Sequence, residues 1–323
     1  MAVYTQLPNE DIAALVEQTY GLGQLALAVG IAQGVENSNY LLELQSGTKY
    51  ILTLYEKRVA AADVPFFLEL MKHLAGRGIA CPQPVARADG TLWGEVAGRP
   101  AALVTFLQGK SHVRLGNQHC ASVGTALAQL HDGVAGFTGR RANSLSLEGW
   151  KTIYDKIEQR VDEIQPGLRQ LIAHELGYLQ EHWPAATALP RGIVHADLFP
   201  DNVFFINDKV SGVIDFYFAC EDFFAYDLAI TLNAWCFERD RSFNRTKAQL
   251  LMDAYRAQRP LTEAEQAAFP VLMRGAALRF LLSRAHDLLF HEKSALVTPH
   301  DPLEYAAKLR FHQQVAGANE YGI

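Results

Sequence analysis

The stretch GIVHADLFPDNVFFI, residues 192–206, places four polar side chains between short apolar runs. The four are His195, Asp197, Asp201 and Asn202. The valines, isoleucines and phenylalanines on either side favour buried strands. A polar group beside a buried strand costs free energy unless it has a partner. The stretch is therefore either a capped turn or a functional site.

The residues that follow this stretch predict a β-hairpin. Two β-rich runs, VFFI and VSGVIDF, flank the turn-forming pair Asn207-Asp208. Asp197 and Asn202 precede the first run and Asp215 lies near the end of the second, so the hairpin is expected to bring all three to one end. Two carboxylates and an amide oxygen form a hard-oxygen site suited to Mg²⁺. Phosphoryl transfer needs such a site, because its transition state demands charge neutralisation and alignment.

The first 108 residues alternate between helix and strand patterns. They predict a capped helix from Asn9 to Gly21, three antiparallel strands within residues 24–55, a helix over residues 61–76, and two or three further strands after Pro84. Turn signals stand at Ser46-Gly47, at Asp89-Gly90 and at residues 98–100. These patterns predict a β-rich lobe over residues 1–108.

The remainder of the chain is mainly helical in pattern. Helices are predicted over residues 121–130, 150–182, 245–257, 262–290 and 301–314, with the polar hairpin as the exception. We find no internal repeat and no low-complexity linker. The expected fold class is therefore α+β with two lobes, an antiparallel sheet lobe at residues 1–108 and a helical lobe at residues 109–323.

Composition excludes several classes of function. The net charge is -6 and the pI is near 6.0, with no long basic run, so nucleic acid is not an expected partner. The N-terminal residues lack the pattern of a secretory signal, and no apolar run is long enough to span a membrane. The four cysteines are far apart in sequence, which argues against a disulfide framework and favours a reducing cytoplasm. Oligomeric state cannot be predicted from the sequence.

The polar motif resembles one family closely. Asp197 is followed five residues later by Asn202, then by Ile214-Asp215-Phe216 and by Asp227-Leu228-Ala229. This series resembles the aminoglycoside phosphotransferase and choline kinase branch of the protein-kinase-like fold. The upstream segments GVENSNYLLELQSGTKYILTLYEKR and TFLQGKS, with the two-lobe order, most resemble the bacterial homoserine kinases of that branch. The resemblance covers nearly the whole chain and implies ATP and Mg²⁺ as cofactors and L-homoserine as the small-molecule substrate.

The resemblance also implies roles for the polar residues. Asp197 resembles the catalytic base, Asn202 and Asp215 resemble the metal ligands, and His195 resembles the residue that braces the catalytic loop. Asp227 is expected to be structural, either capping a helix or holding the loop in place. The competing interpretation is a simple turn with Pro200 at its corner. It does not explain the residues Asp215, Phe216 and Asp227 that follow in order.

The nucleotide site departs from the usual kinase pattern. Thr53 occupies the strand position where kinases place a lysine that holds the nucleotide phosphates. Lys57 lies on the same strand face and is one possible substitute, the other being that it is an ordinary solvated lysine. The candidate nucleotide-binding residues are Gly34, Asn37, Ser38, Thr53 and Lys57, with Thr105, Phe106 and Leu107 as the hinge that pairs with adenine.

An amino-acid substrate needs a cation for its carboxylate and an acceptor for its ammonium group. The candidate substrate-binding residues are Tyr217, Glu221, Asp222, Arg279 and Arg284. Two alternatives stay open. The first is a relative that phosphorylates an aminoglycoside, choline or another small alcohol. The second is a nucleotide-binding pseudokinase, suggested by the missing strand lysine, which would show no magnesium-dependent release of ADP.

Overall fold

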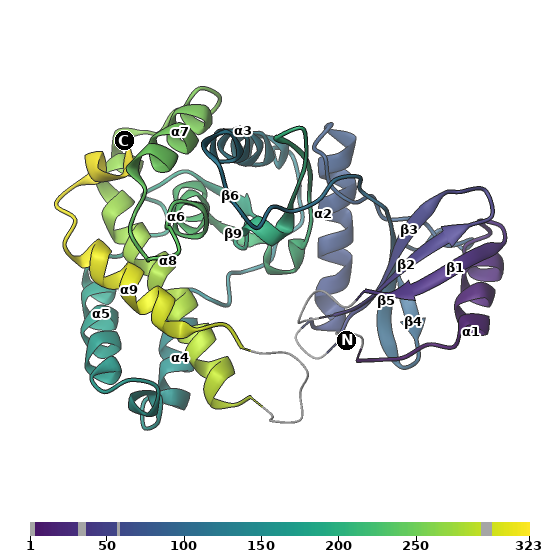
Figure 1. Cartoon of the computed structure of the whole chain (residues 1–323), viewed down its shortest axis with the longest axis horizontal. Helices are drawn as coiled ribbons and strands as arrows, with labels where there is room; N and C mark the ends of the chain where they lie inside the picture. Colours follow the sequence, from purple (N-terminus) through teal and green to yellow (C-terminus); the bar gives the residue numbers. More distant parts are fainter. Residues whose placement is uncertain (1–3, 32–36, 57–58, 292–298) are drawn as a thin grey trace. The chain divides into compact units, whose positions relative to one another are not determined.

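The computed structural model describes residues 4–31, 37–56, 59–291 and 299–323, and the chain forms two compact units (Figure 1). The first unit contains residues 1–109 together with the short segments 136–139 and 211–217, and the second contains the rest. The prediction of two continuous lobes assigned both short segments to the helical lobe, because they come after residue 109 in the sequence.

The first unit is built on a five-stranded antiparallel sheet in the order β1-β2-β3-β5-β4. The strands are β1 (Leu25–Gly30), β2 (Ser38–Leu44), β3 (Lys49–Leu54), β4 (Gly94–Val96) and β5 (Arg99–Thr105). The three strands predicted within residues 24–55 are confirmed. Asp89-Gly90 forms a small turn closed by Arg87 N and Thr91 O at 2.8 Å, whereas the β4–β5 hairpin turns at Ala97-Gly98.

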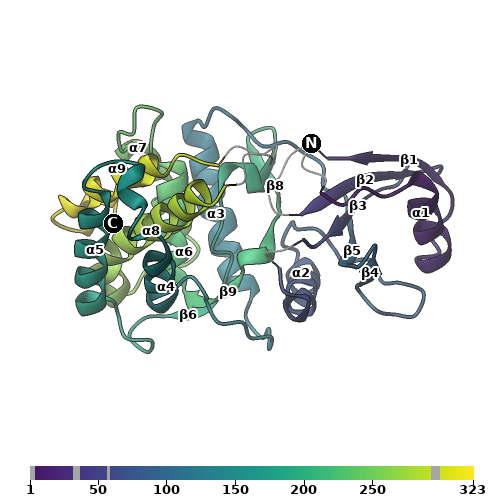
Figure 2. The same cartoon turned by 90° about the horizontal axis from the view of Figure 1, so that it is seen from below.

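Helices cover this sheet because their apolar positions recur with helical spacing. Helix α1 (Asn9–Ala14) continues into a π-helical turn over Leu15–Thr19 and packs on the sheet through Ile12, Val16 and Tyr20 (Figure 2). Asn9 is not the expected cap, because it is already helical and Pro8 at the N-cap makes no side-chain bond. Helix α2 (Val64–Gly76) confirms the helix predicted over residues 61–76.

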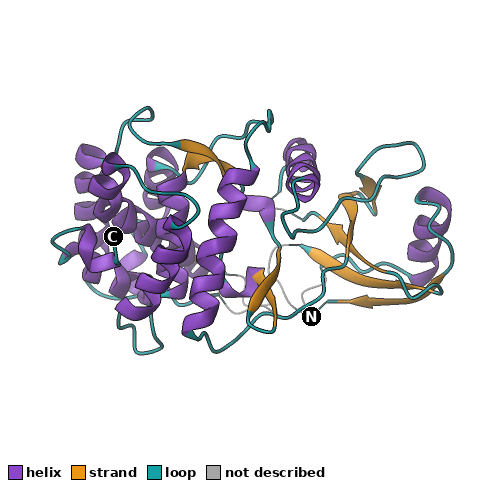
Figure 3. Ribbon diagram, turned by 90° about the horizontal axis from the view of Figure 1, so that it is seen from above, coloured by secondary structure: helices purple, strands orange, loops and turns teal. Residues whose placement is uncertain are grey.

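The second unit is mostly helical, with short strands only (Figure 3). Its helices are α3 (Asn117–Gly133), α4 (Leu147–Ile157), α5 (Leu168–His182), α6 (Phe224–Trp235), α7 (Arg245–Arg256), α8 (Glu263–Leu289) and α9 (Pro302–Gln313). Four of the five predicted helices are confirmed. The single helix predicted over residues 150–182 is wrong, because Pro166 and the left-handed Gly167, with φ of 85°, separate α4 from α5.

The predicted hairpin is formed by β7 (Val203–Ile206) and β8 (Lys209–Val213). Asn207 and Asp208 turn between them with φ of 49° and 61°, values that asparagine and aspartate tolerate better than most residues. A second antiparallel pair joins β6 (Arg191–Val194) to β9 (Cys220–Phe223). It was not predicted as a pair, because short strands distant in sequence leave a weak local signal. Within the described residues, no helix is long and apolar enough to cross a membrane.

Helix α9 is tied to α6 through the buried His312. The ring lies 3.0 Å from Asn233 Oδ1 through Nε2 and 3.0 Å from Tyr321 Oη through Nδ1. The Asn233 oxygen can only accept, so Nε2 donates, and the Tyr321 hydroxyl can donate to Nδ1 of a neutral ring. Burial, helped by the charges of Lys308 and Arg274, lowers the pKa of His312 to about 3.

This shift predicts a loss of stability in mild acid. An unfolded histidine takes up a proton below pH of about 6.5, whereas folded His312 resists protonation until about 3, so stability falls as pH decreases through this window. Between pH 7.5 and 5 the histidine is expected to contribute about 2 kcal/mol to that fall. Urea unfolding of the wild type and of His312→Gln at both pH values measures the difference. Equal losses in the two proteins would contradict the assignment.

Candidate active site

The polar loop begins where β6 ends, and a buried carboxylate from α6 holds its main chain. Asp227 is inaccessible to solvent and accepts the backbone N–H of His195 at 2.9 Å and that of Ala196 at 2.8 Å. Ala196 has φ of 62°, a left-handed conformation that costs an L-residue roughly 1–2 kcal/mol. Of the two structural roles expected for Asp227, the structure shows the second, since its side chain fixes the loop.

A chain of buried side chains extends behind Asp227. His131 on α3 approaches Asp227 Oδ2 through Nε2 at 3.0 Å and Tyr255 Oη through Nδ1 at 2.8 Å, and Arg259 donates to the same tyrosine oxygen at 3.2 Å. Burial opposes ionisation of Asp227, but the hydrogen bonds from His131 and the backbone outweigh it and lower the carboxyl pKa. For His131 burial acts in the other direction and lowers the pKa, despite the hydrogen bond to Asp227. The pair is therefore an aspartate anion bound to a neutral histidine.

Asp197 and Asn202 are brought together within the loop. Asn202 Nδ2 donates to the Asp197 main-chain oxygen at 2.8 Å and to Asp197 Oδ2 at 3.1 Å. The amide nitrogen is thus turned toward Asp197, which leaves the amide oxygen available as a ligand for a cation. Trp235 on α6 fixes the next residue, because its indole N–H donates to the Leu198 carbonyl at 2.8 Å.

Arg279 on α8 also contacts this loop. It is only 2% exposed, and its Nη1 donates to the Ala196 carbonyl oxygen at 2.6 Å. The peptide group between Ala196 and Asp197 is held at its other edge as well, since Asp197 N donates to His195 Nδ1 at 3.2 Å. The sequence motif identified Asp197, Asn202 and Asp227, but it carried no signal for His131, Tyr255 or the main-chain contact of Arg279.

Asp215 belongs to the first unit, where its charge acts on the hydroxyl groups of Tyr217 and Tyr55. Burial and then the Asp215 charge raise the pKa of Tyr217 to about 12. Tyr217 packs edge-on against Tyr55, with ring centroids 5.1 Å apart. Thr53 on β3, the residue expected at the position of the kinase lysine, donates its hydroxyl to Asn39 Oδ1 at 2.8 Å. The expectation that Asp215 meets Asp197 and Asn202 stays a prediction.

The other nucleotide-binding candidates are placed as follows. Ser38 donates to Glu56 Oε1 at 2.7 Å, and its oxygen accepts from the N-terminal segment, so structural bonds occupy the hydroxyl. Asn37 is buried and its side-chain oxygen accepts from Glu56 N at 3.3 Å. Thr105 ends β5, Phe106 has an exposed ring, and Leu107 follows; their hinge role remains a prediction. Gly34 and Lys57 lie outside the described residues.

The acids proposed for the substrate ammonium have structural partners. Glu221 and Asp222 lie on β9. Glu221 forms ion pairs with Arg140 at 3.0 Å and Arg191 at 3.6 Å. Asp222 accepts from Asn143 Nδ2 at 2.6 Å, and burial raises its pKa.

Arg284 on α8 is held in an ion cluster with α9. It pairs with Glu304 at 2.7 Å, and Lys308 donates to the same carboxylate at 2.5 Å. Burial opposes ionisation of Glu304, but the two cations lower its pKa to about 2. Among the hydrogen bonds of the described residues, one joins a substrate candidate to the loop that carries Asp197. That candidate is Arg279.

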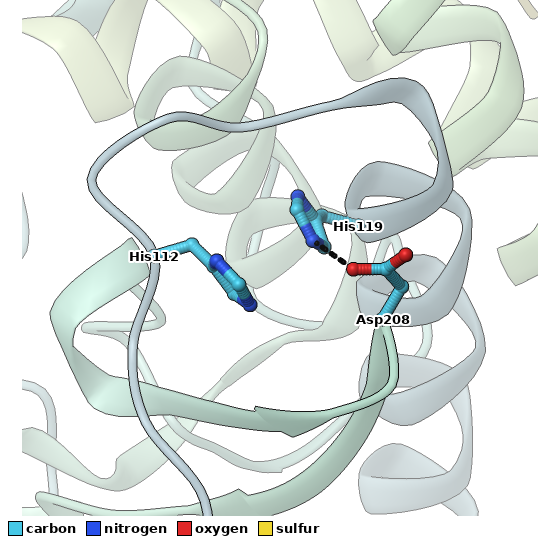
Figure 4. A group of neighbouring side chains, drawn as sticks. All are labelled: His112, His119 and Asp208. Carbon is cyan, nitrogen blue, oxygen red and sulfur yellow. Dashed lines mark hydrogen bonds and ion pairs between the residues drawn. The ribbon is translucent and has the colours of Figure 1, made fainter.

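A separate group of metal-ligand residue types lies in the second unit. His112, His119 and Asp208 bring one ligand atom each within 4.8 Å of the others (Figure 4). The two imidazole rings are stacked, with centroids 4.3 Å apart and planes 25° apart. A metal lies in the plane of each bound ring at about 2.0–2.1 Å, which stacked rings cannot share.

The hydrogen bonds of His119 also argue against a bound metal. Gly116 N donates to its Nδ1 at 2.9 Å, so Nε2 carries the proton and donates to Asp208 at 2.9 Å. A metal-binding histidine usually donates from its second nitrogen instead. The group is therefore a cap at the start of α3, and not a metal site.

Comparison with known proteins fits this geometry. The model of the phosphotransferase enzyme family matches residues 28–261. The chain belongs to this family. It is 53% identical over 323 residues to a homoserine kinase of Sinorhizobium fredii, and 55% identical over 324 residues to one of Rhodopseudomonas palustris. Both matches cover 100% of this chain and 98% of the relative.

Solved structures support the same fold. A choline kinase from Cryptosporidium parvum has a TM-score of 0.69 at 15% identity and covers 95% of both chains. An amicoumacin kinase, solved with AMP-PNP, Ca²⁺ and Ami, has a TM-score of 0.69 at 16% identity, and the match covers 95% of this chain and 93% of that kinase. The two-lobe kinase-like α+β fold predicted from sequence is confirmed, and the chain is a phosphotransferase enzyme.

Proposed function

We propose that this enzyme transfers the γ-phosphoryl group of ATP to the side-chain hydroxyl of L-homoserine, giving O-phospho-L-homoserine on the route to threonine. The observation that carries the proposal is the match of more than half of all residues, over the full chain, to relatives named homoserine kinase. The loop geometry supports it, because Asp197 and Asn202 are fixed side by side on a rigid main chain. A phosphoryl-transfer site depends on such positioning more than on covalent chemistry.

Asp197 is the proposed catalytic base. Its carboxylate would accept the proton of the substrate hydroxyl as that oxygen attacks the γ-phosphorus, and ADP would leave on the opposite side. Asn202 restrains the carboxylate through its amide nitrogen, and His195 receives the Asp197 N–H. Holding the base and its main chain in this way reduces the entropy that alignment with the hydroxyl would otherwise cost.

Mg²⁺ is the proposed metal cofactor, with Asn202 and Asp215 as its protein ligands. The donors fit, because an amide oxygen and a carboxylate are hard ligands and the amide nitrogen of Asn202 is already engaged by Asp197. When bound, the cation would neutralise charge on the phosphate oxygens. The protein's own contribution is to present these two oxygens and keep Asn202 in a single orientation.

The test of function is ADP release by the purified protein with ATP and Mg²⁺. L-Homoserine, choline, kanamycin and L-serine are compared as acceptors, and we expect turnover with L-homoserine alone. Turnover with another alcohol would support a kinase that has a different substrate. If the protein binds nucleotide but releases no ADP with any of these acceptors, the result would favour a pseudokinase.

The metal assignment predicts that Asp215→Ala abolishes turnover, with kcat reduced by at least about 10³-fold, because one charged ligand is lost. Circular dichroism checks that the fold is retained, and titration with Mg²⁺ checks whether the residual rate has lost its metal dependence. Asp155→Ala, at an exposed position on α4 with only a surface ion pair to Lys151, is the matched control. A rate near that of the wild type would show that Asp215 is not a ligand of the metal.

A further inference from the structure

Arg279 is deeply buried, and its charge acts on the buried Asp222 only from beyond ion-pair distance. Its side chain is 2% exposed, and among the residues that the structure describes it forms no ion pair. Its Nε has no hydrogen-bond partner there either. A buried charge that is not closely paired is costly, so its presence calls for a specific role.

The one strong polar contact of Arg279 is to the main chain next to Asp197. Nη1 donates to the Ala196 carbonyl oxygen at 2.6 Å, the short distance of a charge-assisted bond. This carbonyl and the Asp197 N–H belong to the same peptide group, and the N–H is bound by His195 Nδ1 at 3.2 Å. The plane of that peptide is therefore fixed at both edges.

The orientation of this peptide decides where Asp197 points. Ala196 has φ of 62°, a conformation that persists only when its surroundings impose it. Asp227 binds the N–H of Ala196 at 2.8 Å, and Arg279 binds its carbonyl oxygen. Without the second restraint the peptide can rotate, and the Asp197 side chain rotates with it.

The alternative role, binding of the substrate carboxylate, fits the surroundings less well. Aromatic rings pack against the guanidinium, with its carbon 4.7 Å from the centroid of Phe280 and 5.7 Å from that of Phe218. With 2% of the residue exposed, little of the group can meet a ligand. Carboxylate recognition normally uses two parallel N–H groups, and here Nη1 is committed to the main chain.

We infer that Arg279 is a positioning residue for the catalytic base, acting through the Ala196 carbonyl and not through contact with substrate. The inference rests on the proposed function, since it concerns the base of that reaction. A displacement of the base by about 1 Å is enough to reduce a rate by about 10²-fold. Binding of ATP and of the amino acid does not depend on this contact.

The test compares Arg279→Met and Arg279→Lys with the wild type. We expect Arg279→Met to lower kcat by about 10²-fold with KM for ATP and L-homoserine changed by less than about 3-fold. Lysine can donate one hydrogen bond to the same carbonyl, so Arg279→Lys is expected to recover at least about 5-fold of the loss. If the methionine variant does not fold, the lysine variant still provides the comparison.

The matched control is Arg274→Met. Arg274 is a second largely buried arginine on α8, but it pairs with Glu175 at 2.6 Å and lies over the Tyr178 ring. This control should lose stability while kcat of the folded fraction stays within about 2-fold. A similar fall in kcat for both variants would assign the effect of Arg279 to stability and overturn the inference.

Two further readouts separate the possible outcomes. Hydrogen–deuterium exchange of peptides covering residues 193–203 should accelerate in Arg279→Met and not in Arg274→Met, and this holds whatever the substrate is. If the wild type fails to use L-homoserine, the proposed function is wrong. Hydrogen–deuterium exchange then still tests whether Arg279 holds the loop. A KM for L-homoserine raised more than about 10-fold, with 3-aminopropan-1-ol unaffected, would make Arg279 the carboxylate ligand. Unchanged exchange and unchanged kcat would also overturn the inference.

Discussion

Asp197→Asn is expected to reduce kcat by about 10³-fold or more, while KM for ATP remains close to that of the wild type. An asparagine keeps an oxygen that can accept from Asn202 Nδ2, now 3.1 Å from Asp197 Oδ2, so the loop should retain its shape. It cannot accept the hydroxyl proton, and general-base catalysis contributes about 10²–10⁴-fold. Steady-state ADP release with saturating L-homoserine measures the effect.

The control for this variant is Asp201→Asn. Asp201 lies in the same loop, in the 3₁₀ turn Pro200–Asn202, and is exposed to solvent. It should change kcat by less than about 2-fold, since exposed substitutions away from specific contacts usually have small effects. An Asp197→Asn enzyme with more than a tenth of wild-type kcat would show that another group accepts the proton.

Asp227→Asn is expected to destabilise the protein by about 3–5 kcal/mol, the range for removing one partner of a buried charged pair. Asp227 accepts three hydrogen bonds, from His195 N, Ala196 N and His131 Nε2. An asparagine must turn its NH₂ group toward at least one of these donors, which leaves a buried N–H without an acceptor. Turnover of the folded fraction should fall too, because the same carboxylate fixes the loop before Asp197.

Urea unfolding measures this loss of stability, and activity assays at low temperature measure the turnover that remains. Asp132→Asn, at an exposed position on α3 next to His131, is the control and should change the unfolding free energy by less than about 0.5 kcal/mol. Tyr255→Phe removes the outer hydroxyl that binds His131 and Arg259, and should cost about 1 kcal/mol. An Asp227→Asn protein as stable as the wild type would refute the network as a source of stability.

Local features of this protein were predictable because local sequence carries them. The hairpin at residues 203–213 follows from two β-rich runs and a turn pair that tolerates positive φ. Asp197 and Asn202 are five residues apart in one loop, so their contact at 3.1 Å needs no distant partner. Periodic apolar residues likewise predicted most of the helices, with errors where a turn interrupted a long pattern, as at Gly167.

The residues that surround the loop were decided by tertiary structure alone. Arg279 and Ala196 are separated by 83 positions, and His131 and Asp227 by 96. Nothing in helical periodicity identifies which arginine of α8 binds a main-chain carbonyl, or which acid becomes a structural partner, as Glu221 does. Apolar spacing determines which face of an element is buried, but packing between distant elements determines which polar groups meet there. The sequence by itself therefore determined which residues are proposed to react, whereas the buried contacts that hold Asp197 and Asn202 in position depended on the tertiary fold.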